Sequence, residues 1–231
     1  MNDFPLVLIL TGGFGTRLKS VVGDLPKALA EAEGVPFLDI QLSWLAKQGA
    51  RDVVLLTGFK AQNIDSYIIG GSSWDLNLSS LAESSPLGTG GAILNAVSEL
   101  NISKGFLVLN GDSLTEVSLK EFSFNGKDSD CAGFVVVHQK NSQRFGTVEF
   151  DSDNILVGFQ EKSKNPKAGW INAGIYYFPP RWFERTKINS YPVSLENDLI
   201  PQWLSQGRSM GVFPTRGNFI DIGTPDSFSL F

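Results

Sequence analysis

The chain has 231 residues, of which 42% are hydrophobic and 19% are charged, and its formal net charge is -5 at pH 7. A chain of this length and composition can bury the core of one globular domain, which excludes a disordered or repeat protein. The acidic balance offers no broad basic surface to a nucleic-acid backbone. Any bound phosphate must therefore be held by a few placed cations and backbone amides.

The N-terminal region and the rare residue types narrow the class further. The apolar run Leu6–Leu10 is too short for a signal peptide or a membrane span. The single cysteine, Cys131, has no internal disulfide partner, and the single histidine, His138, cannot complete a zinc cluster. We therefore expect a cytoplasmic protein without membrane or nucleic-acid partners, in which any metal has oxygen ligands. A homo-oligomer is compatible with the sequence.

The first half of the chain alternates strand and helix patterns. Short apolar runs bounded by turn residues predict buried parallel strands at Leu6–Leu10, Val53–Leu56 and Phe106–Leu109. Helical patterns lie between them, one that begins at Pro36 and ends near Gly49, and one over residues 92–100. This alternation predicts a doubly wound α/β fold.

The second half contains mostly strand patterns, which predict mixed or antiparallel pairing that extends the same sheet. The predicted strands are Cys131–Val137, Thr147–Phe150, Ile155–Phe159 and Ile171–Phe178, followed by a helix over residues 195–206, a strand before Pro214 and a closing strand over residues 219–222. No linker separates two domains. We expect one α/β domain over residues 1–231, a Rossmann-like three-layer sandwich with a mixed, mostly parallel central sheet.

A glycine-rich segment follows the first predicted strand and reads Thr-Gly-Gly-Phe-Gly-Thr-Arg-Leu over residues 11–18. Glycines after a buried strand let backbone N–H groups approach a phosphate chain, and Arg17 and Lys27 can neutralise its charge. A tight turn that simply needs glycine is the alternative interpretation. A dinucleotide fingerprint needs glycine where Leu18 stands, and a P-loop needs Gly-Lys-Ser/Thr, which is absent.

Two aspartates are candidate ligands of Mg²⁺. Asp112 follows the predicted strand Phe106–Leu109 and should project from its carboxyl end, where open α/β sheets bind ligands. Mg²⁺ prefers one or two carboxylates together with phosphate oxygens, and an Asx turn after the strand is the less favoured alternative for Asp112. Asp221 lies between two isoleucines, which predicts a buried strand on which a carboxylate needs a partner or a metal.

Two further segments carry polar residues beside glycine. Residues 83–92 form a second glycine-rich turn that leads into a helix, and Glu83 could accept hydrogen bonds from a base edge; an ordinary helix entry is the alternative. Glu161-Lys162 and Asn172-Ala173-Gly174 lie in the strand-rich half, where Lys162 could meet a second phosphate and Glu161 and Asn172 could meet sugar hydroxyls. A solvated charge pair is the alternative for Glu161 and Lys162.

Together these segments resemble the sugar-1-phosphate nucleotidyltransferase family, and in particular its short members that transfer guanylyl groups to heptose 1-phosphates. The matching motifs are Leu-Thr-Gly-Gly-Phe-Gly-Thr-Arg-Leu with Leu-Pro-Lys, Ser-Pro-Leu-Gly-Thr-Gly-Gly-Ala, Leu-Asn-Gly-Asp-Ser, Arg-Phe-Gly-Thr-Val, Phe-Gln-Glu-Lys, Ile-Asn-Ala-Gly-Ile-Tyr and Phe-Ile-Asp-Ile-Gly-Thr-Pro. They occur in the family's order over residues 6–226. The family more often has alanine at Thr11 and a longer aromatic lead before Glu83.

The resemblance implies a role for each motif. The catalytic residues would be Arg17, Lys27, Asp112 and Lys162. The nucleotide would contact Thr11, Gly12, Gly13, Gly15, Thr16, Glu83, Gly88, Thr89, Asn110 and Gly111, with Glu83 and Gly88 beside the base. The sugar phosphate would contact Gly146, Glu161, Lys162, Asn172 and Gly174, and Mg²⁺ would bind Asp112 and Asp221. Residues up to about 112 would then form the nucleotide-binding half, and residues from about 113 the sugar-phosphate-binding half.

The implied reaction is in-line attack of a sugar phosphate oxygen on the α-phosphorus of a nucleoside triphosphate, with release of pyrophosphate. A phosphate monoester is already ionised, so no general base is needed, and positioning and charge stabilisation carry the catalysis. Guanylyl transfer to a heptose 1-phosphate is the preferred hypothesis, within bacterial surface-carbohydrate precursor synthesis. Uridylyl or cytidylyl transfer and a catalytically silent nucleotide-sugar sensor remain open. A dehydrogenase is disfavoured, because Leu18 stands where the dinucleotide-binding fingerprint needs glycine.

Overall fold

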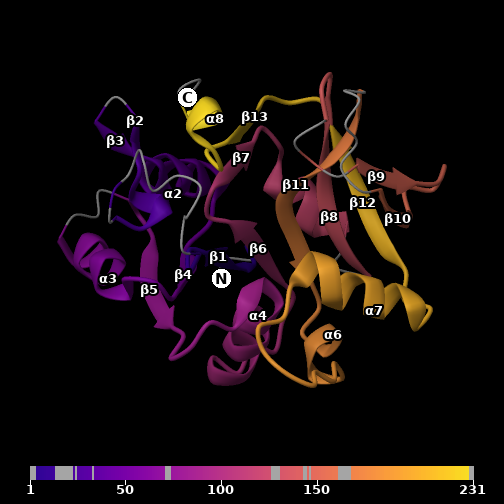
Figure 1. Cartoon of the computed structure of the whole chain (residues 1–231), viewed down its shortest axis with the longest axis horizontal. Helices are drawn as coiled ribbons and strands as arrows, with labels where there is room; N and C mark the ends of the chain where they lie inside the picture. Colours follow the sequence, from indigo (N-terminus) through magenta and orange to yellow (C-terminus); the bar gives the residue numbers. More distant parts are fainter. Residues whose placement is uncertain are drawn as a thin grey trace.

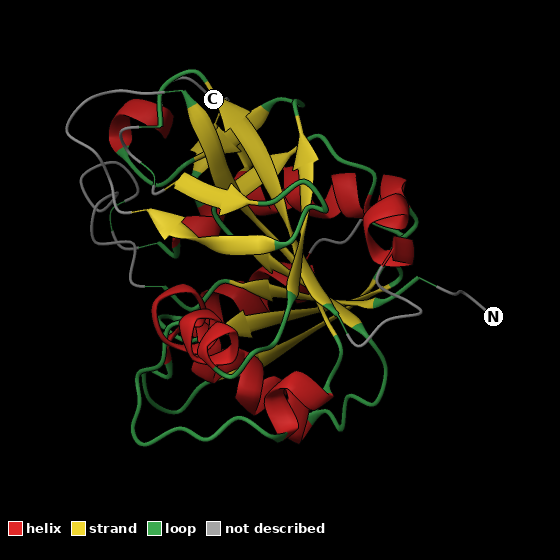
Figure 2. Cartoon of the chain, turned by 90° about the vertical axis from the view of Figure 1, so that its right-hand side faces the viewer, coloured by secondary structure: helices red, strands yellow, loops and turns green. Residues whose placement is uncertain are grey.

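The computed structural model of the chain describes residues 4–13, 23, 25–32, 34–70, 74–125, 131–142, 145, 147–160 and 168–228. Across these residues a nine-stranded mixed sheet lies between two layers of helices (Figures 1 and 2). The predicted α/β fold with a mixed central sheet is confirmed. No helix within the described ranges is long and apolar enough to cross a bilayer.

The parallel part of the sheet comes from the first half of the chain. Strand β1 (Leu6–Leu10) lies between β4 (Asp52–Thr57) and β6 (Phe106–Asn110), and β5 (Asn77–Ala82) follows β4. Parallel neighbours require crossover connections, which contain the helices α2 (Phe37–Gln48), α3 (Ala61–Gly70) and α4 (Gly88–Glu99). Because the four strands are parallel, their carboxyl ends meet at one edge of the sheet. The sequence analysis did not predict α3 or β5.

The second half extends the sheet through antiparallel pairing with β6, as predicted. Strand β11 (Gly169–Phe178) pairs with β6 on one side. On its other side it pairs with two strands that continue the sheet through their own partners. The two strands are β8 (Ala132–Gln139) and β9 (Thr147–Phe150). Strand β8 pairs in turn with β12 (Met210–Thr215), and β9 pairs with β10 (Leu156–Gln160).

Alternate strand residues divide the core between the two faces of the sheet. Leu8 and Val108 pack in one cluster with the residues of α4, whereas Val7 and Leu107 pack in the other with the apolar face of α2. Helix α2 ends where it was predicted to end, because Gly49 adopts the left-handed conformation at φ 95°. Both clusters are anchored on central strands, so the residues at the ends of these strands are held by a rigid frame.

The predicted helix over residues 195–206 is found as the π-helix η2 (Leu195–Leu199), which continues into α7 (Ile200–Ser205). The closing strand β13 (Phe219–Asp221) differs from the prediction: it is half-buried, because it pairs with β7 (Ser113–Thr115) in a separate two-stranded sheet. The remaining short elements are η1 (Lys27–Leu29), β2 (Glu31–Ala32), β3 (Val35–Pro36), α5 (Leu119–Asn125), α6 (Arg181–Glu184) and α8 (Pro225–Phe228).

Candidate functional site

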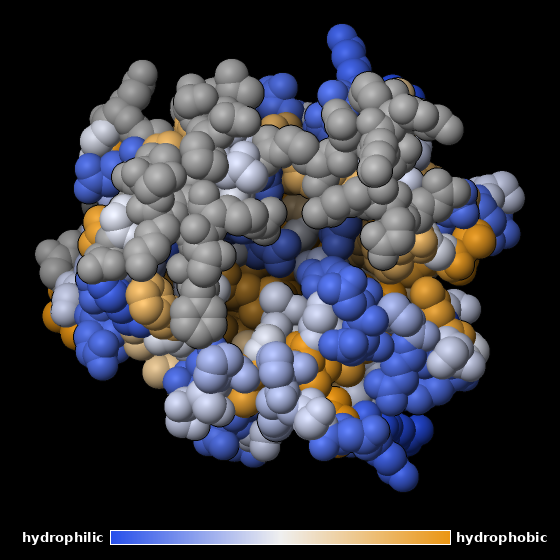
Figure 3. Space-filling model, in the orientation of Figure 1, coloured by the Kyte–Doolittle hydropathy of each residue, from blue (hydrophilic) through white to orange (hydrophobic). Residues whose placement is uncertain are grey.

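A cavity of about 390 Å³ opens at the carboxyl ends of β1, β4 and β6, beside the start of α4. A hollow is visible near the middle of the face shown in Figure 3. The predicted residues that line the cavity are Gly12, Gly13, Glu83, Gly88, Thr89, Asn110, Gly111 and Asp112, and Leu10, Leu56, Pro86, Ala92 and Pro192 complete the lining. Three sequence segments that were predicted to bind the nucleotide therefore meet in one place.

Thr11 anchors the first glycine segment to the sheet. Its backbone N–H and its hydroxyl both donate to the carbonyl oxygen of Leu56, each at 2.9 Å. The residue is only 6% exposed and does not line the cavity. The hydroxyl that distinguishes this chain from relatives with alanine is therefore satisfied by β4, and it holds the neighbouring Gly12 in place.

The Glu83 side chain packs directly on two glycines. A Cβ atom at Gly12 would lie 3.4 Å from Oε1 of Glu83, and a Cβ atom at Gly58 would overlap the same oxygen. The other oxygen, Oε2, accepts the backbone N–H of Leu87 at 3.0 Å. Burial raises the pKa of Glu83, against the lowering effect of this hydrogen bond. Glu83 therefore closes the turn before α4 while it lines the cavity.

Lys27 and Asp112 form an ion pair at the cavity, although they are 85 positions apart in the chain. The ammonium of Lys27 donates to Oδ2 of Asp112 directly beyond the end of β6. Their side chains are 15% and 35% exposed, so the pair is partly screened from solvent. The predicted cation and the predicted metal ligand therefore lie together. The other predicted cations, Arg17 and Lys162, lie outside the described residues.

Asp221 lies on the strand next to the Asp112 turn. In the β13–β7 pairing Asp221 is opposite Ser113, and the N–H of Ile222 donates to the carbonyl of Asp112 at 2.9 Å. One carboxylate oxygen, Oδ1, accepts the N–H of Gly223 at 2.9 Å. No group of three or more metal-ligating side chains occurs in the described part of the chain. Asp112 and Asp221 nevertheless lie on adjacent backbone segments and supply the carboxylate oxygens that Mg²⁺ prefers, together with phosphate and water.

The start of α4 is occupied by the chain itself. Gly88 has φ +78°, and a Cβ atom there would lie 2.8 Å from the backbone nitrogen of Val193. The N–H groups of Gly90 and Gly91 donate to the carbonyl of Val193 at 2.9 and 3.2 Å. These two N–H groups therefore already have an acceptor within the chain, in the segment of residues 191–194. The α4 N-terminus differs in this respect from a helix end whose free N–H groups bind a phosphate.

The predicted sugar-phosphate residues that can be described adjoin the nucleotide residues. Gly174 has φ +71°, and its N–H donates to Oδ1 of Asn172 at 2.9 Å. A Cβ atom at Gly174 would lie 2.6 Å from Nδ2 of Asn110, which lines the cavity. Only glycine permits this approach of β11 to β6. Gly15, Thr16, Gly146 and Glu161 lie outside the described residues.

Gln41 was not singled out in the sequence, although it holds the Asn110 turn. Its side chain is fully buried on α2, and Nε2 donates to the carbonyls of Asn110 and Ser113 at 2.8 and 3.0 Å. A polar residue next to Leu42 on the apolar face of a helix is the signal that could have identified it. Gln41 therefore ties the residues on both sides of Asp112 to the rigid core.

A second group that the sequence analysis did not identify links β11 to η2 and α4. The hydroxyl of Tyr176 donates to Oε1 of Glu196 at 2.8 Å and accepts from Nδ2 of Asn172 at 2.7 Å. The hydroxyl of Thr89 donates to Oε2 of Glu196 at 3.2 Å. Burial and the neighbouring Glu196 raise the pKa of Tyr176 well above its usual range. The sequence gives no signal for this group, because Tyr176 is one of several aromatic residues in a predicted strand and Glu196 is one of the charged residues in a predicted helix.

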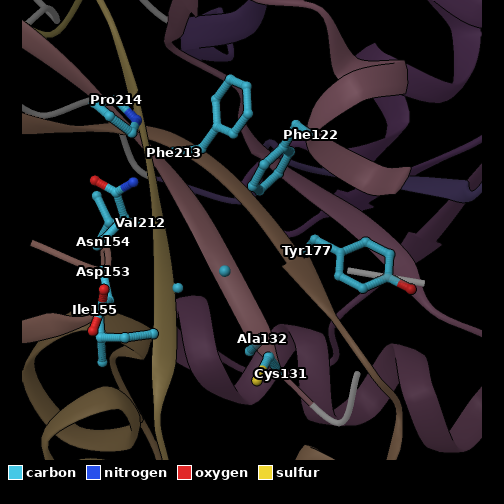
Figure 4. A pocket seen from close by; sticks show the side chains of 12 residues that line it. Phe122, Cys131, Ala132, Asp153, Asn154, Ile155, Tyr177, Val212, Phe213 and Pro214 are labelled. Atoms are coloured by element: carbon cyan, nitrogen blue, oxygen red, sulfur yellow. The ribbon is translucent and has the colours of Figure 1, made fainter. Parts of the chain in front are cut away.

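Another cavity, of about 360 Å³, lies beside β8 and β12 and contains none of the predicted site residues. Figure 4 shows Phe122 and Phe213 on one side of it and Asp153, Asn154 and Ile155 on the other. The two phenylalanine rings are in edge contact, with centroids 5.7 Å apart. None of the described residues of the predicted nucleotide-binding segments lines this cavity, whereas three of these segments meet at the cavity beside Asp112, which is therefore the candidate active site.

Comparisons with known proteins identify the family of the chain. A family model described as nucleotidyl transferase matches residues 6–230. The D-glycero-alpha-D-manno-heptose 1-phosphate guanylyltransferase of Aneurinibacillus thermoaerophilus is 35% identical over 223 residues, which cover 96% of this chain and 94% of that protein. The mannose-1-phosphate guanylyltransferase catalytic subunit beta of Drosophila pseudoobscura pseudoobscura is 32% identical over 96% of this chain, which spans 60% of that longer protein.

Solved structures have a similar fold. HddC from Yersinia pseudotuberculosis, crystallised with GMP-PN, superposes with a TM-score of 0.86 and 33% identity, and the match covers 98% of this chain and 97% of HddC. The putative glucose-1-phosphate thymidylyltransferase from Bacillus anthracis, at 18% identity, has a TM-score of 0.83 over 97% of this chain and 93% of its own. The second likeness concerns the fold alone.

Proposed function

This chain belongs to the nucleotidyl transferase family, and we propose that it transfers a guanylyl group from GTP to a sugar 1-phosphate, with a heptose 1-phosphate as the preferred acceptor. The observation that carries the proposal is the Lys27–Asp112 ion pair, which lies at a cavity lined by both glycine-rich segments. The similarity to guanylyltransferases over nearly the full chain supports the choice of base. The products are a GDP-sugar and pyrophosphate.

In the proposed reaction an oxygen of the sugar phosphate forms a bond to the α-phosphorus of GTP. The bond from that phosphorus to the bridging oxygen breaks on the opposite side, and its electron pair leaves with pyrophosphate. No proton has to be removed, because the attacking phosphate is already ionised. The described residues that line the cavity include no histidine or cysteine.

The residues at the cavity would hold the substrates and balance their charge. We assign the backbone of Gly12 and Gly13 to the triphosphate, because both residues line the cavity and a Cβ atom at Gly13 would have no described heavy atom within 4 Å. The ammonium of Lys27 would move from Asp112 to the phosphate oxygens that gain charge as pyrophosphate leaves. Arg17, Gly15 and Thr16 are assigned to the same phosphates from the glycine-rich motif alone.

Members of this family generally use divalent metal ions, and we propose Mg²⁺ for this chain. Asp112 and Asp221 would hold it, because β13 lies next to the turn that carries Asp112 and both residues supply carboxylate oxygens. Bound there, the metal would stabilise negative charge on the phosphates. Asn172 and Gly174, together with Gly146, Glu161 and Lys162, are assigned to the sugar phosphate. Residues up to about 112 and from about 113 would then serve as nucleotide and sugar-phosphate halves of one domain.

The test is pyrophosphate release from each of four nucleoside triphosphates with a panel of heptose and hexose 1-phosphates in the presence of Mg²⁺. We expect release with GTP and a heptose 1-phosphate. Release with UTP or CTP in place of GTP would correct the base and leave the class intact. Triphosphate binding without release from any pair would favour a nucleotide-sugar sensor over an enzyme.

A further inference from the structure

The Asn172 side chain ends a chain of hydrogen bonds that begins at the carboxylate of Glu196. Tyr176 is the middle member and is fully buried. Its hydroxyl lies 2.8 Å from Oε1 of Glu196 and 2.7 Å from Nδ2 of Asn172. Oδ1 of Asn172 accepts the backbone N–H of Gly174 at 2.9 Å. Four groups from β11 and η2 therefore form one continuous relay.

The chemistry of the two ends fixes the direction of every bond in the relay. A carboxylate can only accept, so the single proton of the Tyr176 hydroxyl is donated to Glu196. The hydroxyl oxygen is then left as an acceptor and must receive an N–H from Asn172. At the other end the N–H of Gly174 can only donate, so it requires the carbonyl oxygen of Asn172. The amide of Asn172 is thereby held in one of its two orientations.

This orientation leaves one hydrogen on Nδ2 of Asn172 without a partner among the described residues, since Tyr176 takes the other. Asn172 is half-buried and adjoins Gly174, which packs against Asn110 at the cavity. A side-chain amide could in general present either a donor or an acceptor to a ligand. Here the relay selects the donor, which suits the oxygens of a phosphate or of a sugar hydroxyl.

We propose that Glu196 is a positioning residue that acts through Tyr176 to make Asn172 a hydrogen-bond donor toward an oxygen of the sugar 1-phosphate. The proposal rests on the proposed function for the identity of this substrate. Glu196 also accepts the hydroxyl of Thr89, which lines the cavity at the start of α4. The same carboxylate therefore holds both the acceptor side and the nucleotide side of the site.

The experiment compares Glu196→Gln with Tyr176→Phe. A glutamine can donate to the Tyr176 oxygen and thus reverse the relay, whereas phenylalanine keeps the ring and removes the relay. We expect each variant to raise the KM for the sugar 1-phosphate about tenfold, the cost of one hydrogen bond, with the KM for GTP changed less than twofold. Because both changes act through one relay, the double variant should show no further increase.

Asp198→Asn is the matched control, because it removes the same charge two residues away. Asp198 is exposed and accepts the N–H of Ser194 outside the relay. We expect its KM for the sugar 1-phosphate to equal that of the wild type. Unchanged KM values in folded Glu196→Gln and Tyr176→Phe proteins, alongside normal wild-type turnover, would overturn the inference and leave the proposed function standing.

A second measurement does not depend on turnover. In ¹H–¹⁵N spectra of the full chain, the side-chain amide resonances of Asn172, assigned by their loss in Asn172→Asp, should shift in Glu196→Gln and in Tyr176→Phe and stay in place in Asp198→Asn. If the wild type releases no pyrophosphate, the proposed function fails while these shifts still report the relay. Resonances that stay in place in both relay variants would show that Glu196 does not orient Asn172.

Discussion

The ammonium of Lys27 donates to the carboxylate of Asp112 across 85 positions of sequence, at the point where β6 ends. Lys27 is the first residue of the short helix η1, directly after Pro26, and Asp112 follows the buried strand β6. Their pairing joins the long first connection of the chain to the centre of the sheet. It also compensates the negative charge of the partly buried Asp112 carboxylate.

Replacement of Lys27 by methionine should slow turnover by about 10²- to 10³-fold, because a preorganised cation would be lost from the departing pyrophosphate. The hydrophobic stem is retained, so thermal stability should change little. Steady-state pyrophosphate release gives kcat. The exposed Lys104→Met serves as the control with the same change, and near-normal turnover in Lys27→Met would remove this residue from the phosphate site.

Asp221→Asn should raise the Mg²⁺ concentration for half-maximal rate by about 10-fold or more, since a weaker neutral ligand replaces a carboxylate. Mg²⁺ titration of the initial rate at saturating GTP measures the effect. Asp52→Asn is a suitable control, because Asp52 begins β4 at the opposite end of the strands. Equal Mg²⁺ dependence in wild type and Asp221→Asn would assign the metal to other residues. Chelation with EDTA should abolish pyrophosphate release.

Glu83 provides a test in pH. Burial raises its pKa in the folded protein above the ordinary value, so its contribution to stability is present at low pH and is lost as the pH rises through the folded pKa. Glutamine cannot ionise. The melting temperature of Glu83→Gln relative to the wild type should therefore increase between about pH 4 and pH 7. A difference that is constant with pH, as expected for the exposed Glu99→Gln, would contradict the assigned burial.

Gly88 and Gly13 should respond oppositely to alanine. At Gly88 the positive φ and the backbone of Val193 leave no room for a Cβ atom, and we expect a loss of about 1–3 kcal/mol or more in the free energy of unfolding. At Gly13 nothing lies within 4 Å of the added atom, so stability should be retained while the affinity for GTP falls. Urea unfolding and GTP titration separate the two outcomes. Equal stability loss at both positions would contradict this geometry.

Gln41→Leu should destabilise the protein by about 1–3 kcal/mol, because the carbonyls of Asn110 and Ser113 lose their buried donors. The turn that carries Asp112 would then be less well positioned, and kcat should fall as well. Gln62→Leu, at an exposed position of α3, is the matched substitution and should leave both quantities unchanged. A stable and fully active Gln41→Leu protein would show that the turn holds its shape without this residue.

Several features of the fold and the site could be predicted because they depend on neighbouring residues. Apolar runs bounded by turn residues identified β1, β4 and β6, and Gly49 identified the end of α2. The position of Asp112 after β6 followed from the same local pattern. Helix α3 and strand β5 were not predicted, and β5 lacks an apolar run because its residues are exposed or only half-buried. The predicted elements were found because hydrophobic periodicity and turn residues depend only on residues that are close in sequence.

By itself, the sequence determined the central strands β1, β4 and β6, the glycine-rich connections and the family that their motifs resemble. Only the tertiary structure decided that Val193 occupies the start of α4, that Asp221 lies beside the Asp112 turn, and that Tyr176 joins Asn172 to Glu196. The physical reason is distance along the chain. These contacts join segments that become neighbours only when the sheet is assembled and its two core clusters pack, so no local pattern contains them.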